Sequence, residues 1–294
     1  MIIAQLKGGL GNQMFQYAAG LSLATHRNVD LLLDVSLYEN QGGEVTPRRF
    51  GLNCFAGSHK FASKLKIFLY SSHSPVARGG RLIMDKISGS PPIYYKEKSF
   101  SFDQDMLGLP ANVYLDGYWQ SERYFLPEEK LIRSAFRFIN PPSGENIRIA
   151  KEISSKNSIS VHFRRGDYAS CKKTSSFHGI PGLEDYYYKA INHLSKLVEA
   201  PRLYIFSDEP DWIESNFHIS IPYEIIRHNG TNQGYEDLRL MSLCPNHIIA
   251  NSSFSWWGAW LSDCQDKQVI APKNWFMDNS IDTRDLIPSS WRRL

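Results

Sequence analysis

Apolar runs and helix-like stretches alternate along the second half of the chain. Residues 158–163 (SISVHF) are dominated by apolar and β-branched types and predict a buried strand. Further strands are predicted at 202–207, 223–227, 247–250 and 268–271. Helices are predicted between them at 182–199, 209–217, 234–244 and 255–263. Because parallel neighbours need crossover connections, this alternation predicts an α/β fold with a parallel sheet.

The first half begins in the same way and then becomes irregular. A strand is predicted at 2–6, a helix at 12–26 and a second strand at 31–34. Residues 40–100 mix Gly, Ser, Pro and basic residues, which favours loops and short helices. A strand at 113–119 and a helix at 126–138 then follow.

The length and one linker-like segment indicate two domains. A chain of 294 residues corresponds to about two domains as a prior. Residues 139–146 (INPPSGEN) hold a proline pair, Ser and Gly, and form the best candidate linker. We therefore predict one domain over residues 1–145 and a second over 146–294.

The N-terminal segment KGGLGNQMFQYAAG has the outline of a dinucleotide-binding fingerprint. Gly9 and Gly11 open a predicted helix, and Asp34 closes the next predicted strand. The third glycine of the fingerprint is replaced by Met14, however, and that glycine normally lets helix and strand pack closely. An NAD(P)-dependent oxidoreductase is therefore the weaker alternative. Asn12 and Gln13 supply amides suited to sugar hydroxyls or to a diphosphate; the alternative is a tight turn capped by Asn12.

Polar residues follow three of the predicted strands in the second half. RRGDY follows 158–163, SDEP follows 202–207, and NSSFS follows 247–250. Ligands of open α/β sheets bind beyond the carboxyl ends of the strands. These three strand ends are therefore the candidate ligand site.

Two adjacent arginines stand at the first of these strand ends. A guanidinium group suits phosphate because its donor fork matches two oxygens. Arg164 and Arg165 point to opposite sides if the chain is still extended, so one can serve a ligand and the other the scaffold. Asp167 could pair with Arg165 or fix the loop. A surface salt-bridge loop is the alternative interpretation.

The segment ANSSFSWWGAW, at 250–260, places small polar residues between a strand and a helix. One Ser or Asn is explained as the helix N-cap. A helix N-terminus with several hydroxyls is also a suitable phosphate site. The three tryptophans of the segment are expected to pack in the core.

Acidic residues near the other strand ends have two interpretations each. Asp208 could accept hydrogen bonds from a base or sugar, or cap the helix that begins near Pro210. Asp237 lies early in a predicted helix, where the dipole favours acids in any case.

The D-x-D at Asp103 and Asp105 is short, lies in the irregular region, and is interpreted as surface. No His/Cys cluster has metal-ligand spacing, so no metal is predicted.

Composition excludes several classes of protein. The net charge of +3 does not imply a nucleic-acid partner. No apolar run approaches the ~18 residues of a membrane span, and no signal-type segment opens the chain. The four cysteines are widely spaced, which fits reduced thiols. We expect a cytoplasmic protein, with room for weak peripheral contact at the inner face of the membrane.

Five motifs together resemble the bacterial α-1,2-fucosyltransferases of glycosyltransferase family 11. They are GGLGNQMFQYA, GYWQSERYF, HFRRGDY, FSDEPDW and HIIANSSFSWWGAWL, in that order from residue 8 to about residue 275. The resemblance implies a GT-B architecture, with two Rossmann-like domains and a cleft between them. It implies that the C-terminal domain, 146–294, binds GDP-fucose and that the N-terminal domain, 1–145, holds most of the acceptor. It implies metal-independent, inverting transfer of L-fucose from GDP-fucose to the 2-hydroxyl of a terminal β-galactose. Synthesis of O-antigen or another surface polysaccharide is the implied setting.

The resemblance also implies roles for individual residues. Arg164 would neutralise the β-phosphate of the leaving GDP, with Arg165 and Asp167 in the same element, and His162 would lie near the nucleoside. By looser analogy Asp237 would hold the guanine and Asn12 would face the reacting sugar. The remaining predicted donor contacts are Asp208, Asn251, Ser252, Ser253, Phe254 and Ser255.

Several points stay open at this stage. Asp167, His178 and Glu122 are all candidates for a general base, and the diphosphate itself could take the proton. A GT-B transferase that uses a different nucleotide sugar is a close alternative. The penultimate acceptor sugar and the oligomeric state are not determined by the sequence.

Overall fold

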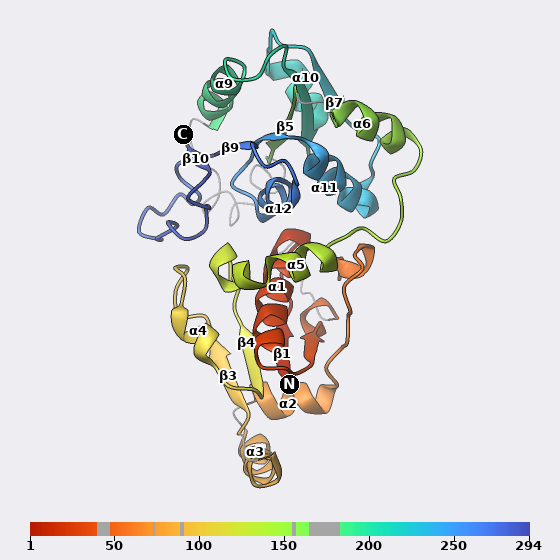
Figure 1. Cartoon of the computed structure of the whole chain (residues 1–294). Coiled ribbons are helices and arrows are strands. Elements are labelled where there is room, and N and C mark those ends of the chain that lie inside the picture. Colours follow the sequence, from red (N-terminus) through yellow and green to blue (C-terminus); the bar gives the residue numbers. More distant parts are fainter. Residues whose placement is uncertain (40–47, 73, 89–90, 155–156, 165–182) are drawn as a thin grey trace. The chain divides into compact units, whose positions relative to one another are not determined.

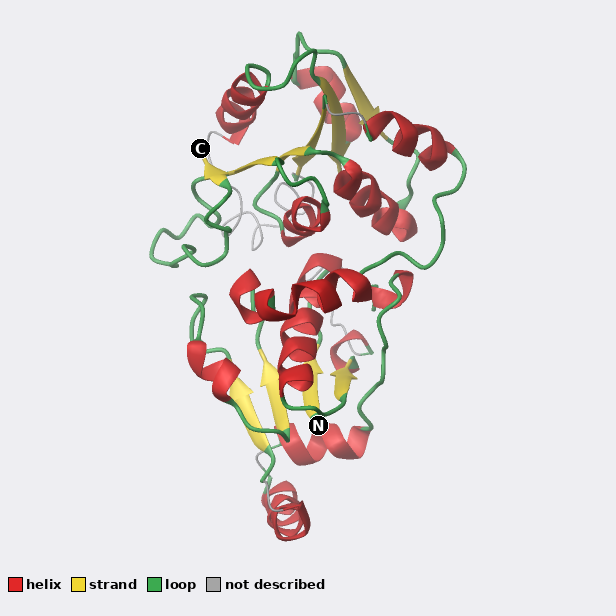
Figure 2. Cartoon of the chain, in the orientation of Figure 1, coloured by secondary structure: helices red, strands yellow, loops and turns green. Residues whose placement is uncertain are grey.

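The computed structural model divides the chain into two compact units (Figures 1 and 2). It describes residues 1–39, 48–72, 74–88, 91–154, 157–164 and 183–294. One unit comprises residues 1–139 with 283–286, and the other comprises 140–282 with 287–294. Asp285 shows why the short return segment belongs to the first unit. Its carboxylate pairs with Arg123 at 2.8 Å and accepts the backbone N–H of Phe102.

The first unit is built on a four-stranded parallel sheet in the order β2-β1-β4-β3. The strands are β1 (Ile2–Gln5), β2 (Leu31–Asp34), β3 (Ile93–Lys96) and β4 (Val113–Asp116). Its helices are α1 (Leu10–His26), α2 (Lys64–Ser71), α3 (Pro75–Ser88), α4 (Gln104–Gly108) and α5 (Glu129–Ala135). Strand β3 lies inside the stretch for which the sequence predicts loops and short helices. It is a short edge strand, so its sequence carries no alternation of buried and exposed residues.

Helix α1 packs closely on this sheet through a glycine that the fingerprint does not include. A Cβ built at Gly20 would lie 2.9 Å from Leu31 and 3.1 Å from the Cβ of Ala4. Met14, at the third fingerprint position, is fully buried in the core. The close contact between helix and strand therefore lies about 1.7 turns further along the helix than in the fingerprint.

The second unit is built on a six-stranded sheet in the order β10-β9-β8-β5-β6-β7, in which every pair is parallel. The strands are β5 (Ser158–Phe163), β6 (Arg202–Ser207), β7 (Tyr223–Ile226), β8 (Asn246–Ile248), β9 (Gln268–Ala271) and β10 (Arg292–Arg293). The helices are α6 (Glu145–Ile153), α9 (Leu183–Leu194), α10 (Pro210–Asn216), α11 (Gly234–Leu243) and α12 (Ser253–Leu261). All five strands expected from the apolar runs form, and β5 is buried along its whole length.

Helix α6 begins within the segment predicted as a linker. Its sequence ENIRIAKEI places Ile149 and Ile153 four residues apart on one face, and both are buried. These side chains pack with Tyr204, Phe206 and Leu240 in a cluster between α6, the sheet and α11. The start of α6 is thus fixed by burial of this face.

The tryptophans of α12 form part of the core, as predicted. Trp256 and Trp257 are fully buried, and Trp260 is nearly so. The rings of Trp256 and Trp257 lie 5.1 Å apart, and Trp291 contacts Trp256. This packing anchors the helix and therefore fixes the turn that precedes it.

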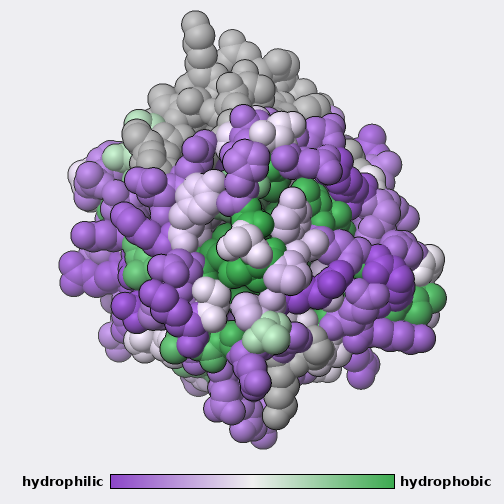
Figure 3. Space-filling model, turned by 90° about the horizontal axis from the view of Figure 1, so that it is seen from above, coloured by the Kyte–Doolittle hydropathy of each residue, from purple (hydrophilic) through white to green (hydrophobic). Residues whose placement is uncertain are grey.

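The face shown in Figure 3 is mostly hydrophilic, with apolar residues gathered near its centre and at a few places toward its margin. Among the described residues, none of the helices has the length and hydropathy that crossing a bilayer requires. Cys54, Cys244 and Cys264 are free thiols, and Cys171 lies outside the described residues.

Candidate active site

The carboxyl ends of β5, β6 and β8 lie along one edge of the second sheet. β5 pairs in parallel with both β6 and β8, and Phe163 lies opposite Ser207 at the ends of β5 and β6. The residues that directly follow these strands are therefore neighbours. The polar strand ends predicted from the sequence meet at this edge.

Arg164 and Asp208 form an ion pair at this edge. Their closest side-chain atoms, Nη1 and Oδ2, are 3.3 Å apart, and the two side chains are 24% and 25% exposed. A partly exposed pair at this distance contributes little to stability. The guanidinium group of Arg164 is thus held at the strand end and remains accessible to solvent, as an anion site requires.

His162 lies beside this pair with an unsatisfied ring nitrogen. Its side chain is 6% exposed, and Nδ1 has no hydrogen-bond partner among the described residues. Burial, reinforced by the positive charge of Arg164, lowers the pKa of His162 to about 3, so the ring is neutral. A buried polar atom without a partner is costly, and a ligand could satisfy it. The ring of Phe254 lies 5.8 Å away.

The serine-rich turn between β8 and α12 combines a helix cap with ligand-facing residues. The Oγ of Ser252 accepts the N–H of Phe254 at 3.4 Å and makes Ser252 the N-cap. Ser252, Ser253 and Phe254 are half-buried. Asn251 and Ser255 are buried; Asn251 donates to the carbonyl of Trp275, and Ser255 donates to that of Ser252. Of the predicted contacts in this turn, the three half-buried residues are the accessible ones.

Asp237 stands in the first turn of α11, beyond the carboxyl end of β7. Burial raises the pKa of Asp237 to about 6, although a hydrogen bond from Asn229 at 2.8 Å opposes the rise. Asn229 also exchanges two amide hydrogen bonds with Asn146, which contacts His228. The sequence analysis missed this network. Part of the network could have been predicted, because the polar residues HNG at 228–230 directly follow a predicted strand.

Glu236, next to Asp237, has a structural role. It forms a buried ion pair with Arg239 at 2.8 Å, and Arg239 also donates to the carbonyl of Asn140. Both side chains are less than a tenth exposed. The pair fixes the start of α11 against the segment that enters the second unit.

Three predicted residues lie outside the described part of the chain. These are Arg165, Asp167 and His178, in the segment 165–182.

Asn12 belongs to the first unit and lies in the first turn of α1. Its Oδ1 accepts a hydrogen bond from Nε2 of Gln120 at 2.8 Å. The next residue, Gln13, is fully buried and bonds to the backbone of Gly8, Arg49 and Gly51. Asn12 is therefore the half-buried residue of the G-N-Q element, and Gln13 holds the surrounding loops together.

The acidic residue of the dinucleotide fingerprint is used inside the core. Asp34 is 1% exposed, accepts the hydroxyl of Tyr114, and accepts the N–H of Ser36 at 2.9 Å. A carboxylate committed in this way cannot bind a ribose hydroxyl. This geometry counts against a dinucleotide site at the N-terminal glycines.

The D-x-D pair is structural. Asp103 caps α4 by accepting the N–H of Asp105, and it also accepts the hydroxyl of Tyr95 at 2.6 Å. Lys98 pairs with both carboxylates. Within the described residues, His, Cys, Asp and Glu form no group of three or more that could hold a metal ion.

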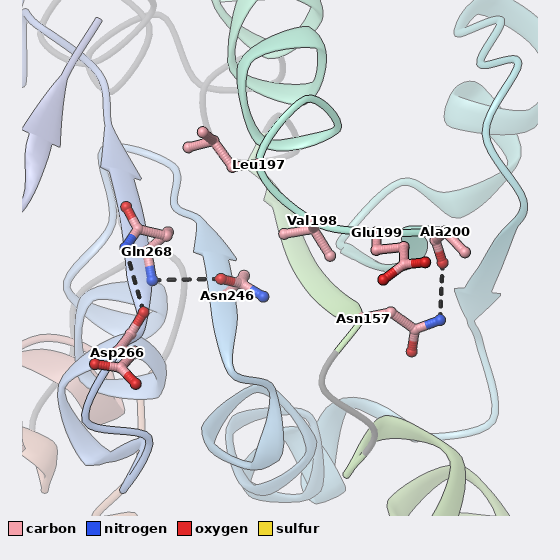
Figure 4. Close-up of a pocket in the computed structure, with 8 residues that line it drawn as sticks. All are labelled: Asn157, Leu197, Val198, Glu199, Ala200, Asn246, Asp266 and Gln268. Atoms are coloured by element: carbon pink, nitrogen blue, oxygen red, sulfur yellow. Dashed lines mark hydrogen bonds between the residues drawn. The ribbon is translucent and has the colours of Figure 1, made fainter.

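A groove of about 680 Å³ opens at the opposite edge of the second sheet (Figure 4). It is lined by residues that precede or begin the strands, with the amide of Asn157 donating to the carbonyl of Ala200. Because it lies at the amino ends of the strands, it is separate from the edge that carries Arg164. We assign it no role.

The two parallel α/β units are Rossmann-like domains of the GT-B type of fold. The crystal structure of the fucosyltransferase NodZ from Bradyrhizobium has a similar fold, with a TM-score of 0.51 at 16% identity. The alignment covers 88% of this chain and 92% of NodZ. The cleft expected between the domains stays a prediction.

Sequence comparison identifies the family. The model of glycosyl transferase family 11 matches residues 94–293. An alpha-1,2-colitosyltransferase of Escherichia coli is 35% identical over 100% of this chain and 99% of its own length. The O-antigen biosynthesis glycosyltransferase WbnK of Escherichia coli is 32% identical over 98% of this chain and 99% of its own length. The chain belongs to glycosyltransferase family 11 and is a glycosyltransferase.

Proposed function

We propose that this protein transfers L-fucose from GDP-fucose to the 2-hydroxyl of a terminal β-galactose, with inversion and without a metal. The setting we propose is O-antigen synthesis at the cytoplasmic side of the membrane. The observation that carries the proposal is the partly exposed guanidinium of Arg164, held by Asp208 beside the unsatisfied nitrogen of His162. These groups share one sheet edge with the N-terminus of α12.

The groups at this edge match the parts of a nucleoside diphosphate. Arg164 offers a fork of donors to the β-phosphate, and the Ser252–Phe254 turn offers a helix N-terminus to the diphosphate. The neutral ring of His162 and the carboxylate of Asp237 can hydrogen-bond to the nucleoside. Asn12, in the first unit, is proposed to face the reacting sugar.

Arg164 has the most important role in the proposed reaction, which is to stabilise negative charge on the leaving diphosphate. Negative charge grows on the diphosphate as the bond to the sugar breaks, and preorganised donors lower the barrier because they need no reorganisation. On binding, the diphosphate would replace Asp208 as the partner of the guanidinium group. We propose that Asp208 orients Arg164 in the free protein, and that Asp167 acts close to the reaction as base or scaffold.

Transfer of colitose is the second candidate, favoured by the 35% identity to an alpha-1,2-colitosyltransferase. Colitose differs from fucose by lacking the 3-hydroxyl group. The groups described at the second sheet address the nucleotide and not this hydroxyl, so both donors fit them.

Replacing Arg164 by Ala tests the proposal. We expect the rate of transfer to fall by about 100-fold or more, because one preorganised donor is lost. We also expect GDP to raise the melting temperature less than in the wild type, since weaker binding gives less stabilisation. Arg202→Ala is the matched control, because Arg202 pairs with Glu224 at the start of β6, at the opposite edge of the sheet.

The control should retain transfer and the full response to GDP. A folded Arg164→Ala protein with the wild-type rate would show that the assignment of this edge is wrong.

A further inference from the structure

Helices α2 and α3 pack against each other in the first unit (Figure 1). A Cβ at Gly80 of α3 would lie 2.5 Å from the side chain of Leu69 in α2, so the two helices touch at this point. The guanidinium group of Arg81 donates to the carbonyls of Leu69 and Ser72, at 2.8 and 2.7 Å. Because these carbonyls stand at the carboxyl end of α2, Arg81 caps that helix and holds α3 beside it.

One side of each helix is buried by this packing and by the first sheet. Tyr70 of α2 is buried in a cluster with residues of the sheet, and Ile67 and Leu69 pack on the same cluster. On α3, Ala77 is fully buried and Met84 packs on that cluster as well. The inward sides of both helices are therefore occupied.

The outward sides nevertheless carry large apolar side chains. Val76, Leu82 and Ile83 of α3 are 75%, 62% and 61% exposed. Leu65 and Phe68 of α2 are also exposed, and they lie on one side of that helix because they are three positions apart. Single exposed apolar residues need no explanation, but five on two packed helices form a surface that another molecule can cover.

Basic residues lie among these apolar side chains. Lys64, Arg78 and Lys86 are exposed, and Lys66 is half-buried. Lys64 pairs with Glu39 at 3.3 Å, but their side chains are 89% and 53% exposed, so the pair is weak. We call the outward sides of the two helices the α2–α3 surface; its members are Lys64, Leu65, Lys66, Phe68, Val76, Arg78, Leu82, Ile83 and Lys86.

The positive charge of the chain is concentrated in these helices. Residues 64–88 contain five Lys and Arg residues and one acid, Asp85, which gives a net charge of +4. The whole chain carries +3, so the other residues together carry −1. The exposed apolar side chains therefore lie where the chain is most basic, and the complementary partner is anionic.

We propose that the α2–α3 surface binds an anionic lipid membrane. Amphipathic helices with Lys and Arg beside Leu, Ile, Val and Phe bury their apolar side chains at the level of the lipid headgroups, and their cations are attracted to anionic lipids. A second copy of the chain could cover the apolar side chains, but it would set like charges against each other. The membrane is thus the partner that fits both the apolar and the basic residues.

The α2–α3 surface and Asn12 belong to different ends of the first sheet. Met1, which precedes β1, packs on the same cluster as Ile67 and Leu69, so α2 lies near the amino end of β1 (Figure 1). Asn12 instead follows the carboxyl end of β1, in the first turn of α1. Membrane binding is therefore compatible with the role proposed for Asn12, and would raise the local concentration of any acceptor carried on a lipid.

Flotation of the purified protein with lipid vesicles tests the proposal without any sugar substrate. We expect the protein to float with vesicles of phosphatidylglycerol and phosphatidylethanolamine, and to stay in solution with vesicles of phosphatidylcholine alone. Binding should weaken in about 1 M salt, where the Debye length falls to about 3 Å. Equal binding to the neutral vesicles, or no binding to the anionic vesicles, would overturn the proposal.

The first variant removes two exposed apolar side chains. Leu82→Gln/Ile83→Gln should bind anionic vesicles about tenfold more weakly, because it loses apolar burial, while Gln preserves helix propensity. Leu197→Gln/Leu243→Gln is the matched control, because both leucines are exposed in the second unit. The control should bind like the wild type.

The second variant removes two cations. Arg78→Gln/Lys86→Gln should also bind anionic vesicles about tenfold more weakly, because each cation near the membrane adds to the attraction. Lys189→Gln/Lys196→Gln removes the same net charge from exposed positions of the second unit and should bind like the wild type. Unchanged binding of either surface variant, or an equal loss in its control, would contradict the assignment of this surface.

Light scattering without lipid identifies the other possible occupant. A wild-type dimer that Leu82→Gln/Ile83→Gln converts to a monomer would show that a second copy covers the surface, and would overturn the proposal. Failure of the proposed function gives a different result. A protein that binds anionic vesicles but transfers no fucose would contradict the proposed transfer and leave the membrane-binding role of the α2–α3 surface intact.

Discussion

The ionisation of Asp237 makes the stability of the protein, and the guanine contact that we propose, depend on pH. Its raised pKa of about 6 means that the folded state favours the neutral carboxyl group. In the unfolded chain the carboxyl group has its ordinary pKa of 3.8, so ionisation of Asp237 costs stability progressively as the pH rises from about 4 through 6. The same rise in pH creates the anionic acceptor that we propose for guanine.

The first prediction at this scale concerns the affinity for GDP. We expect the affinity of the wild type to weaken below pH 6, by up to about tenfold per pH unit. Asp237→Asn should lose this component, because the amide does not titrate in this range. Isothermal titration calorimetry of both proteins between pH 5 and 8 measures it, and titration of GDP itself cancels in the comparison.

If the affinity for GDP depends on pH in the same way in the wild type and in Asp237→Asn, Asp237 does not bind the nucleotide. The stability of the wild type should in any case decrease relative to Asp237→Asn as the pH rises through 6.

A site residue could be predicted from the sequence when one short segment contains all the residues that indicate its position in the fold. Arg164 and Asp208 each directly follow an apolar run, so both could be placed at a strand end, and the structure pairs them. The network of Asn146, Asn229 and Asp237 could not be predicted in the same way. Asn146 belongs to a segment that resembles a linker and reaches Asn229 through folding across 83 positions.

At the scale of elements, the contact between α1 and the first sheet depends on Gly20. Adding a methyl group there would place it 3.1 Å from the Cβ of Ala4, which has no side-chain rotamer by which to move away, and 2.9 Å from the movable end of Leu31. We expect Gly20→Ala to lower the free energy of unfolding by about 1–3 kcal/mol, because the cost of overpacking exceeds the gain in helix propensity. Urea denaturation of the variant measures the change.

Gly79 provides the matched control for this prediction. It also lies within a helix, α3, and a Cβ there would meet nothing within 4 Å. Gly79→Ala should raise the free energy of unfolding by up to about 1 kcal/mol through helix propensity alone. If Gly20→Ala and Gly79→Ala have the same free energy of unfolding, the neighbours of Gly20 can move aside to accept a methyl group.

Elements could be predicted where burial gives them a strong pattern. Strands β5 and β6 are buried over most of their length and appear in the sequence as apolar runs. Strand β3 is a partly exposed edge strand, and β10 has two residues and both are arginines. Neither has a local pattern, because both depend on pairing with a strand that is already in place.

At the scale of the whole molecule, both sheets place their polar residues at the carboxyl ends of the strands. The second sheet offers donors for a diphosphate, and the first offers the amide of Asn12, which follows β1. This division agrees with a transferase that binds a nucleotide donor and a glycan acceptor through different domains. The family match could be anticipated from five motifs spread over most of the chain, whereas the choice of donor sugar could not.

Incubation of the purified protein with GDP-fucose or GDP-colitose, a panel of β-galactosides and EDTA tests the central claim most directly. Mass spectrometry of the products reports the sugar that is added. We predict a gain of one fucose on a galactoside in the presence of the chelator. A gain of colitose alone would contradict the choice of donor, and the absence of any product with either donor would contradict the proposed transfer itself.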